Sequence, residues 1–186
     1  MTGHTAEDHL GELEIDNGRA VVRYVRRLPQ PPGAVWQAIT EDDHLTAWFP
    51  TTIDGDRAAG ATLTFRFADV DLPPMTGTMV TFDPPSTMEF TWGEDVVRFE
   101  LAPGDGAGTV LTLIVTMAEI GKAARDAAGW HVCLDNLAVD VAGGGVESAG
   151  HGDRWRPLND AYAERFGPEA ATVGPPKEWV DKYGEV

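Results

Sequence analysis

The sequence predicts an α+β fold in which a curved antiparallel sheet wraps around a long C-terminal helix, with two short helices after the first strand. One observation is a hydrophobic period of two residues between Ala61 and Ala118, which is typical of strands. Another is the return to helical spacing after Gly121. The length of 186 residues is enough for one domain with a core and extensions.

The first predicted strand covers residues 19–27, "RAVVRYVRR", which is rich in valine and tyrosine with charged residues interspersed. The prolines of "LPQPPG" then favour the start of a helix. Val35, Trp36 and Ile39 follow at helical spacing and predict the first short helix.

A second short helix is expected to begin at Thr40, because Thr40 and Asp43 stand in an approximate capping-box relation. Leu45 and Trp48 lie three residues apart on one face, and Pro50 ends the pattern. The first third of the chain is therefore predicted to be strand, helix, helix.

The middle of the chain predicts an antiparallel meander. Its segments alternate apolar and polar residues and are separated by turn sequences such as "DPPS" and "APGDGAG". The five predicted strands are residues 62–67, 75–82, 87–92, 96–101 and 109–117.

The long helix is predicted from one apolar stripe. At about 100° per residue, its members fall on one side of the helix. They are Ala123, Ala127, Trp130, Leu134, Leu137 and Val141. The glycines at 143–145 end this helix, a shorter helix is expected over residues 157–166, and the remainder from 168 to 186 is expected to be a loose tail.

The segment "GWHVCLD" within the long helix gathers potential metal ligands. On a helix, His131 and Cys133 point about 160° apart, so they do not grip one ion together. His131 and Asp135 could share an ion, but two ligands fall short of a closed zinc shell. Cys133 has no local base and is expected to be a small buried hydrophobe. We therefore predict that this segment packs on the sheet with Trp130 as its anchor.

Other candidates for chemistry are weaker. Glu94 and Asp95 lie at a predicted hairpin turn and are expected to be solvated, and His44 lies on a polar stretch of a short helix. The glycine runs lack the spacing of a phosphate-binding loop, and neither GxSxG nor HExxH occurs. The sequence predicts no catalytic residue, no metal and no organic cofactor.

Apolar residues from the three predicted layers are instead the candidate ligand-binding residues. They surround the space between a curved sheet and a helix, a geometry that often leaves a ligand-sized gap. They are Trp48, Phe49, Phe65, Phe67, Met88, Phe90, Trp92, Phe99, Trp130 and Leu134. Trp48 and Phe49, in "AWFP", are expected to line the mouth of that space, although a purely structural plug is nearly as consistent with the pattern.

Composition narrows the class of partner and the compartment. The formal net charge is −16, which repels nucleic acid and anionic lipid headgroups. Cys133 is the single cysteine, so no internal disulfide forms, which fits a reducing compartment. We expect no signal peptide, because residues 1–16 have neither a positive nor an apolar segment, and no membrane span, because no run approaches about 18 apolar residues. We expect a cytoplasmic protein without nucleic-acid or membrane partners.

The order of elements resembles the helix-grip fold of the START and birch-pollen-allergen (Bet v) superfamily, also called SRPBCC. Three motifs, "PPGAVWQAITEDDHLTAWFP", "GTMVTFDPPSTMEFTWG" and "GWHVCLDNLA", are similar to those of bacterial homologues of the heat-shock-protein-90 ATPase activator's C-terminal domain. The similarity covers about residues 19–143. It implies a hydrophobic cavity between the sheet and the long helix, and it carries no catalytic residue to transfer.

These observations lead to one functional prediction with two alternatives. We expect non-catalytic binding of a small hydrophobic molecule in that cavity. The alternatives are a co-chaperone-like protein-interaction module, and a cyclase or hydrolase that uses at least two buried ionisable groups. The predicted divisions are an N-terminal extension (1–18), a helix-grip domain (19–149), and a C-terminal helical extension and tail (150–186) whose apolar residues are packing contacts or a homodimer patch.

Overall fold

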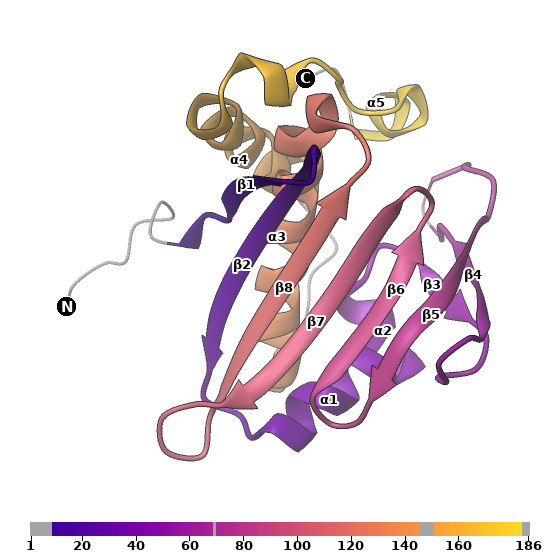
Figure 1. Cartoon of the computed structure of the whole chain (residues 1–186), viewed down its shortest axis with the longest axis vertical. Coiled ribbons are helices and arrows are strands. Elements are labelled where there is room, and N and C mark those ends of the chain that lie inside the picture. Colours follow the sequence, from indigo (N-terminus) through magenta and orange to yellow (C-terminus); the bar gives the residue numbers. More distant parts are fainter. Residues whose placement is uncertain (1–8, 69, 146–150, 184–186) are drawn as a thin grey trace.

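The computed structural model describes residues 9–68, 70–145 and 151–183 (Figure 1). One antiparallel sheet forms its centre, with strand order β1-β2-β8-β7-β6-β5-β4-β3. The strands are β1 (Glu12–Asp16), β2 (Arg19–Leu28), β3 (Thr52–Asp54), β4 (Thr62–Arg66), β5 (Met75–Asp83), β6 (Thr87–Trp92), β7 (Asp95–Pro103) and β8 (Thr109–Met117). The predicted meander is confirmed as β4 to β8, while β1 and β3 are short edge strands that the sequence pattern did not reveal.

Helices cover one face of this sheet (Figure 1). The helical elements are α1 (Pro32–Thr40), α2 (Asp42–Trp48), η2 (Ile120–Lys122), α3 (Ala123–Val141), α4 (His151–Phe166), η3 (Pro168–Ala171) and α5 (Lys177–Tyr183). The long helix α3 lies behind the strands, and α4 and α5 lie beyond one end of the sheet (Figure 1). This is the predicted α+β arrangement of a curved sheet around a long helix.

Strand alternation decides which side chains enter the core. Along β2, Val22 and Tyr24 are fully buried, whereas the intervening Arg23 and Val25 are exposed. The same alternation buries every second residue along the whole of β8 and along β7 as far as Leu101. The apolar stripe of α3 packs on this inner face, with Ala127 and Leu134 buried. The core therefore lies between the inner face of the sheet and helices α1 to α3.

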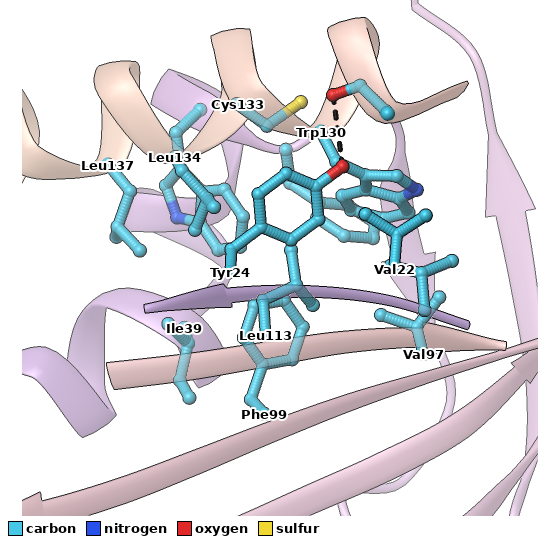
Figure 2. Close-up of a cluster of buried hydrophobic side chains, with 14 of the residues drawn as sticks. Val22, Tyr24, Ile39, Val97, Phe99, Leu113, Trp130, Cys133, Leu134 and Leu137 are labelled. Atoms are coloured by element: carbon cyan, nitrogen blue, oxygen red, sulfur yellow. Dashed lines mark hydrogen bonds between the residues drawn. The ribbon is translucent and has the colours of Figure 1, made fainter. Parts of the chain in front are cut away.

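Tyr24 spans this core from the sheet to the helix. Its ring rises from β2 toward α3 and lies near Cys133 and Trp130 (Figure 2). Its hydroxyl donates a hydrogen bond of 3.0 Å to the carbonyl oxygen of Ala127 (Figure 2). A buried tyrosine needs such a partner for its polar end. The bond thus fixes the distance between β2 and α3.

The capping box predicted for the second short helix is wrong. Thr40 is the last residue of α1, and its hydroxyl donates back to the carbonyl oxygen of Trp36 at 2.7 Å. The next helix begins at Asp42. A threonine hydroxyl bonds equally well to a carbonyl four residues earlier, and that bond competes with capping.

The C-terminal segment is more ordered than predicted. Helix α4 begins at His151 and continues through the exposed Pro157, although the sequence suggested a start at that proline. The expected loose tail instead forms η3 and α5, and the ring of Trp179 lies 4.8 Å from that of Trp155. These contacts join residues far apart in sequence, so local patterns did not reveal them.

Candidate functional site

Eight aromatic rings form a continuous cluster between the sheet and the helices. Each ring lies within 4.7 to 6.5 Å of another member, centroid to centroid, which is the range of favourable edge-to-face and tilted contacts. This aromatic cluster consists of Trp48, Phe49, Phe65, Phe67, Phe90, Trp92, Phe99 and Trp130. All eight are residues that the sequence predicted to bind a ligand.

The centre of the aromatic cluster is a triangle of three rings from three elements. Phe49, just after α2, lies 5.5 Å from Trp92 of β6 and 5.8 Å from Trp130 of α3. Trp92 and Trp130 are 5.9 Å apart. Trp92 is half-buried, as is its neighbour Phe67, so the aromatic cluster reaches the surface at these two rings.

The other predicted ligand-binding residues lie deeper. Met88 and Leu134 are buried in the same core, with 2% and 1% of their surface exposed. Trp48 is held by a hydrogen bond of 2.8 Å from its Nε1 to the carbonyl oxygen of Ala38. Trp48 therefore links α2 to α1 and has a structural role. Phe49 instead contacts the half-buried ring of Trp92.

Two shallow hollows in the described part of the chain lie elsewhere. One, of about 220 Å³, lies between the end of β2 and the turn that joins β7 to β8. The other, of about 340 Å³, lies between β1 and the end of α4 near Phe166. The aromatic cluster itself is filled by the contacts among its rings.

A second group of residues lies where α4 meets β2 and α3. We name this group the polar end, and it consists of Tyr24, Arg26, His131 and Tyr162. The Tyr162 hydroxyl accepts a hydrogen bond of 2.8 Å from the backbone N–H of Gly11. It also lies 2.9 Å from Nδ1 of His131. Tyr162 thus connects the N-terminal segment, the long helix and the C-terminal helix at one buried point.

Burial sets the protonation states at the polar end. Desolvation lowers the pKa of His131 to about 4, so the imidazole is neutral at pH 7. Desolvation also raises the pKa of Tyr162 to about 12 and raises that of Tyr24 well above its usual value. Both tyrosines therefore stay protonated. For Arg26, burial lowers the pKa of the guanidinium, which remains a cation at pH 7.

The "GWHVCLD" segment follows the packing prediction. Trp130 and Cys133 are buried, and desolvation raises the pKa of the Cys133 thiol to about 12, which makes it a poor nucleophile. His131 turns Nδ1 to Tyr162, and its Nε2 lies 3.7 Å from Asp135. Within the described ranges, no three histidine, cysteine or acidic side chains come together as a metal site.

The expectation that both carboxylates of the β6–β7 turn are solvated is wrong for Asp95. Asp95 is 3% exposed, accepts a hydrogen bond from the backbone N–H of Ala118 and pairs with Lys122. Glu94 is exposed as expected. Asp95 therefore links the sheet to the start of the long helix through Lys122. Lys122 is 27 residues away in the sequence, so the local pattern did not reveal this pair.

His44 is partly exposed, and it has a partner that the sequence did not predict. Its Nδ1 lies 2.7 Å from Oδ2 of Asp140, which joins α2 to the last turn of α3. Exposed pairs of this kind contribute little to stability, so the contact is a minor link between two helices.

Two residues of the polar end, Arg26 and Tyr162, have buried polar groups that sequence reasoning missed. One signal was present: alternation along β2 places Arg26 on the same face as Val22 and Tyr24, an unusual position for a charge. No signal pointed to Tyr162, because its partners Gly11 and His131 are separated from it by long stretches of chain.

The geometry defines a helix-grip protein: an antiparallel sheet around a long C-terminal helix, with two short helices after β2. The chain belongs to the family described as "Activator of Hsp90 ATPase homolog 1-like protein", whose model matches residues 29–142. Among curated proteins, no sequence matches this chain. In the part that the structure describes, no helix has both the length and the apolar character needed to cross a membrane.

Solved structures share the fold at low sequence identity. A conserved protein of unknown function from Enterococcus faecalis has a TM-score of 0.70 and 19% identity, over 84% of this chain and 90% of that one. CalU16 from Micromonospora echinospora has a TM-score of 0.67 and 20% identity, over 84% and 95%. A Bordetella parapertussis protein has a TM-score of 0.63 and 24% identity, over 88% and 91%. These similarities establish the fold.

Proposed function

We propose that this protein binds a small apolar molecule between the sheet and α3, without catalysing a reaction. The observation that carries the proposal is the aromatic cluster, which runs without interruption from the half-buried Trp92 and Phe67 to the buried Phe99. Ligand sites in proteins are lined mainly by apolar and aromatic side chains, which offer large rigid surfaces at small entropic cost.

The proposed point of entry is the triangle of Phe49, Trp92 and Trp130. Its rings contact one another across three elements, and Trp92 also contacts the half-buried Phe67. Because these rings fill the space, an entering ligand must displace some of them. We propose that Phe49 and the half-buried Trp92 move aside, whereas Trp48 is held by its hydrogen bond to α1.

The test uses a neutral environment-sensitive dye, Nile red, and fluorescence titration. Phe49→Ala and Trp92→Ala are each expected to change the dye's Kd about tenfold, equivalent to about 1.4 kcal/mol, because each removes part of the proposed binding surface. The matched control is Phe82→Ala, a half-buried ring that contacts Trp36 outside the aromatic cluster. Circular dichroism must show that each variant remains folded.

Three outcomes would contradict the proposal. The first is a parent protein that binds no dye. The second is an unchanged Kd in both aromatic-cluster variants, and the third is a change of the same size in Phe82→Ala. Any of these results would return these rings to a purely structural role.

The alternative functions have less support. Among the described residues, four large apolar side chains are exposed, and they come from four separate elements: Ile15, Val25, Val80 and Val139. A co-chaperone-like surface would need such side chains in one patch. A hydrolase or cyclase would use the buried His131 and Tyr162. However, these two groups bond to each other, and an imidazole with a pKa of about 4 is a weak base at pH 7.

The proposal includes a cytoplasmic location, supported by the single buried cysteine. It retains the helix-grip domain at 19–149 between an extension at 1–18, from which β1 joins the sheet, and another at 150–186, from which α4 covers the polar end. A homodimer through the second extension stays a prediction.

A further inference from the structure

Arg26 is a buried cation on the inner face of β2. It is 9% exposed. It lies at an inward-facing position of β2, and the other residues at such positions are apolar or aromatic core residues. Its Nη1 donates to the carbonyl oxygen of Val25 at 3.2 Å, and its Nη2 is buried without a hydrogen-bond partner among the described residues. A buried charge with an unused donor is strongly unfavourable, so this position calls for an anion.

The described residues supply no spare anion at this position. Asp135 is the one carboxylate whose charge acts on Arg26, and it already accepts a hydrogen bond of 2.9 Å from Arg154. His131 is neutral at pH 7 because of its burial. Arg26 and Arg154 thus share one carboxylate, that of Asp135.

The edge of the sheet beside Arg26 is not covered by another described strand. Pairing between β1 and β2 ends at Glu12 and Arg23, while pairing between β2 and β8 continues as far as Leu28. Figure 1 shows β1 alongside only one end of β2. The stretch Tyr24–Leu28 is therefore an edge strand on this side.

The floor next to Arg26 is apolar. Its cross-strand partner on β8 is Leu111, and the partner of Leu111 on β7 is Leu101. Both leucines are buried, with 0% and 8% of their surface exposed. The Arg26 guanidinium also lies 6.0 Å from the ring of Tyr24, a contact that helps to hold its plane in place. One charged donor thus adjoins a continuous apolar row.

We infer that Arg26 binds the carboxylate of an apolar carboxylic acid whose hydrocarbon part lies along Leu111 and Leu101. A carboxylate fits a guanidinium because two oxygen atoms meet two N–H groups in one plane. This inference rests on the proposed function, since it names the chemical class of the ligand in the space between sheet and α3. It adds a polar anchor that the aromatic cluster lacks.

The test compares two probes of equal chain length, dodecanoate and 1-dodecanol, by isothermal titration calorimetry at pH 7. In the parent protein, dodecanoate is expected to bind at least about tenfold more tightly, the equivalent of one charge-assisted hydrogen bond. Arg26→Met, which keeps an unbranched apolar stem and removes the guanidinium, is expected to abolish the preference. The matched control Arg23→Met, on the exposed face of the same strand, is expected to retain it.

The outcomes separate this inference from the proposed function. Equal affinities of the two probes in the parent, or a preference that persists in Arg26→Met, would overturn the role of Arg26 and leave apolar binding intact. Absence of binding by both probes would overturn both.

A second measurement uses the parent protein alone, in case Arg26→Met does not fold. The carboxyl group of bound [1-13C]dodecanoate is followed by NMR as pH falls. A titration midpoint below that of the free acid supports pairing with Arg26, because a cation stabilises the ionised form. A midpoint equal to or above that of the free acid would overturn the inference.

Discussion

The two ends of the space between sheet and helix differ in chemistry and in origin. The aromatic cluster contains no charged group, and all eight of its residues fall within the stretch that matches the family, 29–142. The polar end joins buried hydroxyl, imidazole and guanidinium groups, and Tyr24, Arg26 and Tyr162 all lie outside that stretch. The stretch that matches the family thus supplies the apolar interior and His131, whereas the flanking segments of this chain add the other three polar residues.

The largest effect should come from the aromatic cluster. Replacing Trp130 by alanine is expected to lower the free energy of unfolding by about 3–5 kcal/mol, as for other large buried residues. Trp130 is 7% exposed and contacts both Phe49 and Trp92. Denaturant melts would measure the change. Val139→Ala on the same helix, where the side chain is 42% exposed, should stay within about 0.5 kcal/mol. Equal losses in both variants would contradict this contrast.

The polar end should impose a pH dependence that the aromatic cluster does not. The pKa of His131 is lowered to about 4 by burial, below the unfolded value of 6.5, so the unfolded chain binds more protons between these values. The contribution of His131 to stability is therefore fully present above pH 6.5 and is lost as pH falls toward 4. The expected loss is about 2–3 kcal/mol.

Thermal or denaturant melts of the parent and of His131→Gln between pH 4 and pH 7 would isolate this contribution, since other titrating groups affect both proteins alike. The difference in stability between them should shrink as pH falls. A constant difference would mean that His131 is not held neutral by its surroundings.

A smaller effect should come from the hydroxyl that closes the polar end. Tyr162→Phe removes the acceptor for the N–H of Gly11 and the partner of His131, and it leaves the ring in place. The expected loss is about 1–2 kcal/mol, because a buried donor then lacks a partner. A double-mutant cycle with His131→Gln measures the coupling between the two side chains, and strictly additive losses would show that their contact contributes nothing.

The sequence revealed the aromatic cluster because its signals are local. The alternation in "TMEFTW" placed Phe90 on the inner face, and the spacing around Trp130 identified the apolar stripe of α3. The same local periodicities and turn sequences predicted the order of elements, and that order resembles the helix-grip fold. The prediction of a helix cap at Thr40 failed although its signal is also local. The threonine hydroxyl can bond to either of two nearby backbone groups, and the local sequence does not decide between them.

What the sequence by itself determined is the layered fold and its apolar interior, because periods of two and of 3.6 residues dictate which face of each element avoids water. What only the tertiary structure decided are the long-range polar pairs, such as Asp95 with Lys122 and Tyr162 with Gly11. A buried polar group must find a partner, but its identity depends on which distant segments the fold brings together. Arg26 combines both: alternation placed it inward, and only the structure showed that one of its donors has no described partner.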